Sequence, residues 1–206
     1  EETLAFETVS PRTQCYMGEC LERLGNLDQA SEYYRASLKL DPEFADAFIG
    51  LGVLAELQGR LAEACAHFEQ ALSIEPEQAD YHLLLATTLK KKGEHERAEK
   101  VYTQGLILDI RNAEIWLERI DNLQVDDRHE NALEVIEDSL TALGENGTIG
   151  YRKFISLYAL SRQIEAFDCL EHLLTHHYDE AQNLIDLFPA LANDARFVKR
   201  LERFKP

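Results

Sequence analysis

The histidines near the C-terminal end come nearest, by type and spacing, to a metal site. His172 and His176 lie four residues apart, so both imidazoles would face the same side of a helix. Zinc needs three or four converging ligands, and His177, Asp179 and Glu180 are the nearest further candidates. No paired motif elsewhere completes such a site, and histidines at a helix end also suit the helix dipole. We therefore expect no metal site and no cofactor.

The cysteines and the short motifs also give little support for catalysis. Cys15 and Cys20 are separated by four residues, and Cys65 and Cys169 stand alone, so none forms a Cys-x-x-Cys pair. We interpret them as small apolar residues of a reducing compartment, which favours a cytoplasmic protein. The sequence contains no nucleophile elbow, phosphate-binding glycine loop or histidine-carboxylate metal motif. It predicts a protein that is not an enzyme.

The charge of the chain restricts its partners. It has 38 acidic and 21 basic residues, a net charge of -17. Basic residues are nowhere dense enough to follow a phosphate backbone, so nucleic acid is not an expected partner. No apolar run approaches the roughly 18 residues of a membrane span. The one basic run, Lys90-Lys91-Lys92, either completes a helix C-terminus or offers a basic spot to an acidic ligand.

An internal period of 34 residues organises the elements that must position all these side chains. Alanine recurs in register at Ala30, Ala64, Ala98, Ala132 and Ala166. Leucine does the same at Leu4, Leu38, Leu72, Leu106, Leu140 and Leu174. A fixed period of this length is typical of a repeat architecture.

Each period predicts a helix, a tight turn and a second helix, because apolar residues recur at helical spacing in two blocks. Gly25, Gly59 and Gly93 follow the first helices, where a left-handed residue is needed that glycine adopts at little cost. Pro42 and Pro76 end the second helices, because proline cannot continue the hydrogen-bond ladder. The recurring alanine allows two helices to approach closely.

These residues resemble the tetratricopeptide repeat, whose signature is Trp-x2-Leu-Gly-x2-Tyr, then Ala-x3-Phe, then Pro. The second period contains Leu51-Gly52, Ala64-x3-Phe68 and Pro76, and the first three periods match well. The fourth keeps Trp116 but has Arg119-Ile120 in place of Leu-Gly and Asp127 at the turn. The fifth keeps little beyond its phase.

The resemblance implies an all-α, right-handed α-α superhelix (a solenoid) of about five repeats with C-terminal capping helices. We expect repeats at 11–44, 45–78, 79–112, 113–146 and, in degenerate form, 147–178. Leu4 and Phe6 lie in phase with Leu38 and Leu40, so residues 1–10 are expected to be the tail of a truncated upstream repeat.

Residues 179–206 predict capping helices, one over 179–188 and one over 195–204, on either side of Pro189. Phe197, Leu201 and Phe204 form one stripe of the latter, with basic residues around it. An array needs a cap with a polar outer face. The alternative is a basic amphipathic arm that binds a partner or folds back on the acidic array.

In the family, the first helices line a concave groove that binds a partner, at positions 2, 5, 9 and 12 of each repeat. The resemblance therefore implies partner-binding residues at Cys15, Glu19, Ile49, Val53, Glu56, Leu83, Thr87, Lys90, Leu117, Asp121, Tyr151, Ile155 and Tyr158. Part of this set could instead pack between adjacent repeats. Some members clamp a C-terminal carboxylate with lysine, asparagine and arginine, but only Arg152 fits that pattern here.

Three functions follow as hypotheses. The first is a non-catalytic scaffold whose groove binds an apolar or basic peptide or helix of another protein. The second is self-association through exposed repeat ends or through the poorly matching fourth and fifth repeats. The third is a targeting domain of a larger enzyme whose catalytic part lies outside this chain.

Overall fold

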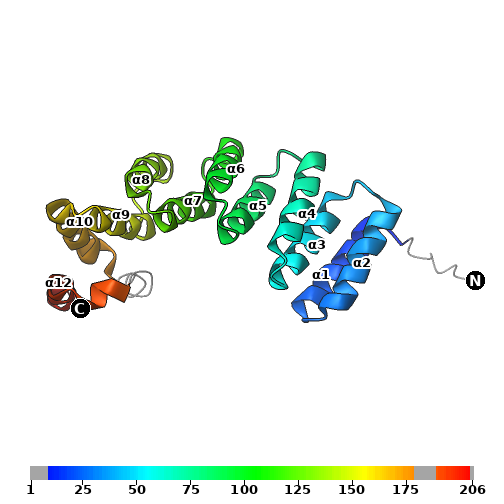
Figure 1. The fold of residues 1–206 in the computed structure, drawn as a ribbon, viewed down its shortest axis with the longest axis horizontal. Coiled ribbons are helices and arrows are strands. Elements are labelled where there is room, and N and C mark those ends of the chain that lie inside the picture. The colour runs from blue at the N-terminus through cyan, green and yellow to red at the C-terminus, as the bar shows by residue number, and fades with distance from the viewer. Residues whose placement is uncertain (1–8, 179–188, 205–206) are drawn as a thin grey trace, which may run out of the picture. The chain divides into compact units, whose positions relative to one another are not determined.

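In the computed structural model, residues 9–178 and 189–204 are described, and these residues form helices joined by short connections, without a β-strand among them. The chain divides into two compact units, residues 1–109 and 110–206. Figure 1 shows the helices of each unit arranged as successive pairs. In the first unit the helices are α1 (Pro11–Arg23), α2 (Leu27–Leu40), α3 (Ala45–Leu57), α4 (Leu61–Ile74), α5 (Ala79–Lys91) and α6 (His95–Leu108).

The second unit has α7 (Ala113–Val125), α8 (His129–Leu143), α9 (Gly147–Ala159), α10 (Gln163–His176), a 3-10 helix η2 (Pro189–Asn193) and α12 (Ala195–Arg203). Within each unit, a second helix packs both on its own partner and on the first helix of the next pair, as α2 does on α3, α4 on α5 and α8 on α9.

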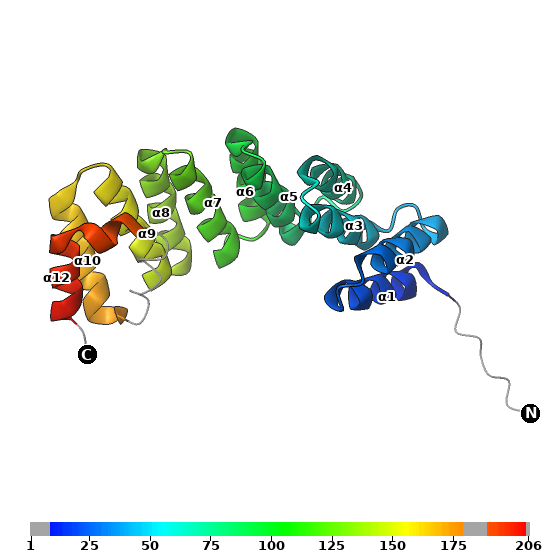
Figure 2. The same cartoon turned by 60° about the horizontal axis from the view of Figure 1, so that its bottom comes forward.

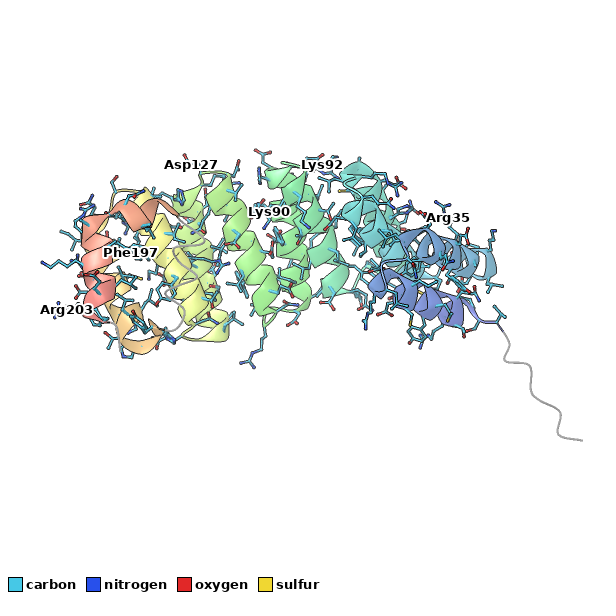
Figure 3. The ribbon with its side chains drawn as sticks, turned by 90° about the horizontal axis from the view of Figure 1, so that it is seen from below. Arg35, Lys90, Lys92, Asp127, Phe197 and Arg203 are labelled. Atoms are coloured by element: carbon cyan, nitrogen blue, oxygen red, sulfur yellow. The ribbon has the colours of Figure 1, made fainter. Side chains whose placement is uncertain are left out.

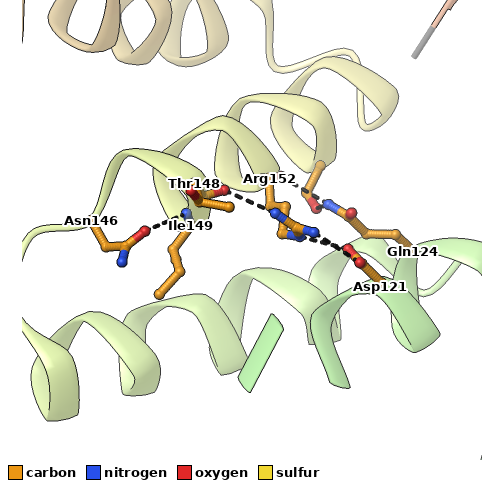
Figure 4. Close-up of polar contacts among 7 residues, drawn as sticks. Asp121, Gln124, Asn146, Thr148, Ile149 and Arg152 are labelled. Atoms are coloured by element: carbon orange, nitrogen blue, oxygen red, sulfur yellow. Dashed lines mark hydrogen bonds and ion pairs between the residues drawn. The ribbon is translucent and has the colours of Figure 1, made fainter. Parts of the chain in front are cut away.

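Polar side chains start several of the first helices. The Ser10 hydroxyl accepts a hydrogen bond from the Thr13 amide at 3.1 Å, with Pro11 as the first helical residue. The Asn146 side chain accepts from the Ile149 amide at 3.1 Å (Figure 4). Both side chains satisfy amide groups that have no partner inside the helix.

The turns between paired helices repeat one backbone conformation. Gly25, Gly59 and Gly93 have φ angles of 79°, 74° and 81°, as the sequence predicted. Asp127 and Ser161 occupy the same place in the next two pairs, with φ angles of 56° and 60°. These two residues have a Cβ in a region that side chains disfavour. The turn is thus kept where the glycine is lost.

The core of the first unit joins small residues to aromatic rings. Ala30 and Ala64 are fully buried, and the rings of Tyr34 and Phe68, four residues on, are buried beside them. A Cβ on Gly52 would lie 2.4 Å from Cε1 of Phe68. Glycine is therefore required there for the ring of α4 to reach the backbone of α3.

The core of the second unit combines apolar packing with a polar tie between α7 and α9. Arg152 of α9 is only 8% exposed, and its Nε and Nη2 donate to the two carboxylate oxygens of Asp121 at 2.6 and 2.9 Å (Figure 4). Gln124 of α7 donates to the Arg152 carbonyl and to the Ser156 hydroxyl, both at 2.8 Å. These hydrogen bonds hold α7 and α9, the first helices of the fourth and fifth pairs, against each other.

At the C-terminal end, α12 lies beside α10 (Figure 2). Phe197 is fully buried and its ring stacks on Phe154 with centroids 6.0 Å apart. Arg200 lies over the Phe167 ring, 4.2 Å from its centroid. In Figure 3 Phe197 lies among the C-terminal helices while Arg203 projects away from them. This helix therefore caps the array, with Phe197 inward, Arg200 against α10 and Arg203 outward.

The predicted all-α fold of helix-turn-helix repeats with a C-terminal cap is confirmed. The predicted capping helix over 195–204 corresponds to α12, whereas the one over 179–188 and most of the predicted tail, residues 1–10, lie outside the described residues. None of the described helices is long and apolar enough to cross a membrane.

Candidate functional site

A pocket of about 340 Å³ opens between α1 and α3 in the first unit. Four of the predicted partner-binding residues line it: Cys15, Glu19, Ile49 and Val53. The remaining lining residues are Arg12, Tyr16, Glu22, Tyr34, Phe44, Asp46 and Gly50. The structure thus gathers the predicted positions of the first two repeats, except Glu56, into one concave surface.

Helical spacing explains why these side chains meet. Cys15, Glu19 and Glu22 recur four and three residues apart along α1, so they share one face of that helix. Ile49 and Val53 share a face of α3 for the same reason. The two faces lie opposite each other because α1 packs against α3.

Tyr34 of α2 closes the floor of the pocket. Its ring lies where a Cβ on Gly50 would be, 2.3 Å from that position, so Gly50 is required for this approach. The Tyr34 hydroxyl donates to Glu22 Oε2 at 2.7 Å. Burial, followed by this bond, raises the pKa of Tyr34 well above its usual value. The ring is therefore held in one position and also orients the Glu22 carboxylate.

The carboxylates make the pocket electronegative. Asp46 Oδ1 accepts a hydrogen bond from the Tyr81 hydroxyl at 2.6 Å, while Glu19 pairs with the exposed Arg23 at 2.7 Å. Burial, reinforced by the charges of Asp46, Glu19 and Glu22, raises the pKa of the Cys15 thiol to about 12. The thiol is therefore protonated at neutral pH and serves as an apolar wall.

The other predicted residues of the first unit lie outside this pocket. Glu56 is turned toward α5, where its carboxylate accepts hydrogen bonds from Thr88 and Lys91. The Thr87 hydroxyl donates to the Leu83 carbonyl at 2.8 Å, and Leu83, Thr87 and Lys90 are all half-buried.

Lysines of the basic run at the end of α5 pair with carboxylates. Lys91 binds Glu56 and Lys92 binds Glu94, and Figure 3 labels Lys90 and Lys92 at the end of that helix. These pairings favour the interpretation of the run as cations that complete a helix end.

In the second unit the predicted residues take part in internal contacts. Asp121 pairs with Arg152, as described above. Tyr151 and Ile155 are buried, and the Tyr151 hydroxyl donates to the His177 carbonyl at 2.9 Å. The Tyr158 hydroxyl donates to Asp194 at the start of α12, while Leu117 is half-buried. Partner binding by these five residues stays a prediction.

The paired histidines contact each other at the end of α10. The rings of His172 and His176 have centroids 4.4 Å apart, and the Nε2 atoms of His172 and His177 lie 3.7 and 3.9 Å from Glu145 Oε1. In the part of the chain that the structure describes, no three histidine, cysteine or acidic side chains are arranged to hold a metal ion.

Sequence reasoning missed several residues of the pocket. The ring of Tyr34 both fills the core and forms the pocket floor, and Tyr34 lies on the second helix, outside the positions compared between repeats. Tyr16 and Phe44 lie outside the positions compared between repeats. Gly50 was a usable signal, because glycine inside a helix often marks the close approach of another group.

Sequence comparisons identify the family. Two family models described as tetratricopeptide repeat match residues 18–82 and 55–120, so that together they span half of the chain. The chain belongs to the tetratricopeptide repeat family. No curated protein sequence matches it significantly.

Solved structures share its fold. MamA has a TM-score of 0.73 at 16% identity, covering 84% of this chain and 94% of MamA. YrrB, described as a TPR protein with an unusual peptide-binding site, has a TM-score of 0.65 at 19% identity, covering 92% and 90%. A tetratricopeptide repeat protein from Parabacteroides merdae ATCC 43184 has a TM-score of 0.75 at 18% identity, covering 94% and 78%. At these identities the similarity shows the fold alone.

Proposed function

We propose that this protein is a non-catalytic scaffold that binds an apolar and basic segment of a partner protein in the pocket between α1 and α3. Tetratricopeptide repeat proteins bind other proteins, and the family is typically non-catalytic. The observation that carries the proposal is the combination of apolar walls and carboxylates in one pocket: Ile49, Val53 and Cys15 beside Glu19 and Glu22.

The charge of the pocket favours a basic group in the ligand. Its carboxylates are Glu19, Glu22 and Asp46, and Arg12 is the one basic residue among its lining residues. A carboxylate-bearing ligand would meet like charge there, which would discriminate against acidic tails. A lysine or arginine with an apolar neighbour complements both features of the pocket. YrrB, which shares the fold, is described as having a peptide-binding site.

Peptide binding to the purified chain tests the proposal. An array of short amidated peptides should contain three matched sets with the same apolar residues. The first set adds lysine or arginine, the second adds glutamine and the third adds glutamate. We expect the basic set to bind best. Ile49→Glu should weaken binding of the best peptide at least tenfold, because it places a charge on the apolar wall.

Ile164→Glu is the matched control, because Ile164 is 81% exposed on α10 and lies outside the pocket. It should bind like the wild type, and melting curves should show that both variants are folded. Preferential binding of the acidic set, or unchanged binding by Ile49→Glu, would contradict the proposal.

Self-association is a second candidate function, favoured by exposed apolar side chains on the first helix pair. Tyr16, Met17, Leu24 and Leu40 are all exposed there. Light scattering over a concentration series should then show a mass that rises with concentration, and Leu24→Asp should reduce it. A monomer at every concentration would exclude this function.

A further inference from the structure

A second groove, of about 720 Å³, lies between α8 and α10 with α9 as its floor. It is formed mainly by the second helices of the fourth and fifth pairs, whereas the predicted partner-binding residues lie on the first helices. Figures 1 and 2 both show α8, α9 and α10 next to one another. Its walls include four leucines: Leu140 is half-buried, whereas Leu133, Leu157 and Leu173 are 9%, 3% and 4% exposed.

The equivalent place in the first unit shows what is unusual here. Between α2 and α4, with α3 as the floor, the pocket is only about 310 Å³. The two places correspond at a shift of three periods, so most lining residues of the smaller pocket have a counterpart that lines the groove. In the smaller pocket His67 packs against Phe48, with ring centroids 6.3 Å apart.

In the larger groove the counterparts of Phe48 and His67 are Gly150 and Cys169. Two rings are thus replaced by a hydrogen and a thiol, whose Sγ lies 3.7 Å from the Gly150 carbonyl oxygen. Cδ2 of Leu173 lies 2.5 Å from the place of a Cβ on Gly150. The loss of the two rings contributes to the larger volume.

The charges of the two places also differ. Arg35 of α2, labelled in Figure 3, has Glu137 as its counterpart on α8, and Ser31 has Leu133. The groove has carboxylates along both rims: Glu130, Glu134 and Glu137 on α8, and Glu165 and Asp168 on α10.

Three of these carboxylates are paired from within the groove. Lys153 pairs with Glu137 at 2.5 Å, and Arg162 pairs with Glu165 at 2.6 Å and with Glu130 at 3.7 Å. Glu134 and Asp168, one on each rim, are exposed and make no ion pair within the described residues. An occupant with positive charge on both flanks would complement them.

The second unit already binds one helix that combines an apolar stripe with basic residues. The helix α12 docks on α9 and α10 through the buried Phe197, while Arg200 Nε donates to Glu171 Oε1 at 3.0 Å. An apolar stripe with flanking arginines is thus a form of helix that α10 binds, and α12 uses a face of α10 that does not include Cys169.

We propose that the groove between α8 and α10 is a second docking site, which binds a basic amphipathic helix of a partner protein. Its leucines would contact the apolar stripe of that helix, and Glu134 and Asp168 would pair with lysine or arginine on its two flanks. Between Glu130 and Leu140 the groove is about 15 Å long at 1.5 Å per residue, so it accommodates about three turns. This site is independent of the pocket between α1 and α3.

Fluorescence anisotropy with the full chain tests the site. The probe is a fluorescein-labelled, amidated 14-residue peptide with leucines on one helical stripe, lysines on both flanks and alanines elsewhere. A matched probe carries glutamate in place of lysine, and a third distributes the same leucines around the helix. We expect the lysine probe to bind at least tenfold more tightly than either of the others.

Charge reversal at Glu134→Lys with Asp168→Lys should weaken the lysine probe at least tenfold. The matched control is Glu32→Lys, because Glu32 is the counterpart of Glu134 in the smaller pocket, and it should change the affinity less than twofold. Leu133→Ser gives this position the residue type that its counterpart has at Ser31. It should weaken binding by loss of apolar contact. Ile49→Glu should leave it unchanged, which separates this site from the pocket between α1 and α3.

Three outcomes would overturn the proposal: unchanged binding by the charge-reversed variant, an equal loss in Glu32→Lys, or equal affinity for the glutamate probe. Light scattering of the chain alone provides a further test. A dimer that Glu134→Lys with Asp168→Lys dissociates would identify the occupant as a second copy instead of a partner helix. Trp116 fluorescence during unfolding verifies that the variants retain the second unit.

Discussion

The first unit packs its helix pairs by placing aromatic rings against glycine, whereas the second unit uses a buried arginine and a cluster of rings around its capping helix. In the first, the rings of Tyr34 and Phe68 lie against Gly50 and Gly52. In the second, Arg152 bridges α9 to Asp121 of α7. Close approach to glycine backbone is thus prominent in the first unit, whereas the second unit adds a buried ion pair between helices.

The largest expected effect comes from removing the polar tie of the second unit. Arg152→Ala would remove both guanidinium hydrogen bonds to the Asp121 carboxylate, and should destabilise this unit by about 3 kcal/mol. Trp116, the one tryptophan of the chain, is buried in this unit. Its fluorescence during urea unfolding measures the change.

Arg162→Ala is the control for that experiment. Its pair with Glu165 is substantially exposed, so the loss should be under about 1 kcal/mol. Equal losses in the two variants would show that the second unit does not depend on the buried tie.

Glycine should matter more in the first unit than in the second. Gly52→Ala would place a Cβ 2.4 Å from the fully buried Phe68 ring and should destabilise by about 2 kcal/mol, since cores tolerate added volume poorly. Gly150→Ala meets only the end of the flexible Leu173 side chain, at 2.5 Å, and alanine favours the helix by about 1 kcal/mol. Its net effect should be close to zero. Thermal unfolding followed by circular dichroism ranks the two, and a larger loss in Gly150→Ala would reverse the comparison.

The turns offer a stabilising change in the second unit alone. Asp127→Gly and Ser161→Gly should each stabilise by about 1 kcal/mol, because both residues have positive φ and glycine adopts that region freely. The reciprocal Gly59→Ser should destabilise by a similar amount. Denaturation midpoints measure all three, and a loss of stability in both glycine variants would argue that the Asp127 and Ser161 side chains compensate for the strain.

The smallest effect concerns the attachment of the cap and depends on pH. Hydrogen bonds from Arg196 and then Tyr158 hold the pKa of Asp194 well below its usual range. Because folding lowers the pKa of this carboxyl, its ionised form stabilises the folded protein at pH values above the pKa of the unfolded chain, which is near 4. This stabilisation is lost as the pH falls toward the pKa of the folded protein.

The difference in unfolding free energy between the wild type and Asp194→Asn isolates this contribution. It should be constant between pH 7 and 5 and shrink below about pH 4. A difference independent of pH over that range would show that the Asp194 charge does not hold α12 in place.

The architecture was predictable because its determinants recur. Glycine at 25, 59 and 93 and alanine at 30, 64 and 98 fix the turn and the close approach in every early repeat, and the period could be found without a structure. The helices α7 to α10 were predicted from phase, which the buried Ala132 and Ala166 maintain. Local spacing was sufficient for these features.

The details of the sites depend on contacts that no periodicity encodes. The sequence placed Asp121 in a groove, but its neighbour Arg152 lies 31 residues away in the chain and pairs with it only after folding. The role of Tyr34 in the pocket follows from the absence of side chains at Gly18 and Gly50. One sequence signal for the groove between α8 and α10 is Gly150, which occupies the position that Phe48 has three periods earlier.

The cysteines give the chain a practical property. Burial raises the pKa of the thiols of Cys15 to about 12 and of Cys169 to about 11, and raises that of Cys65 as well, which slows their reaction because the thiolate is the nucleophile. Cys20, on α1, is the exposed cysteine of the four. A maleimide dye should therefore label α1 selectively. With Trp116 of α7 as the energy-transfer donor, the distance between the two units can then be measured without any substitution.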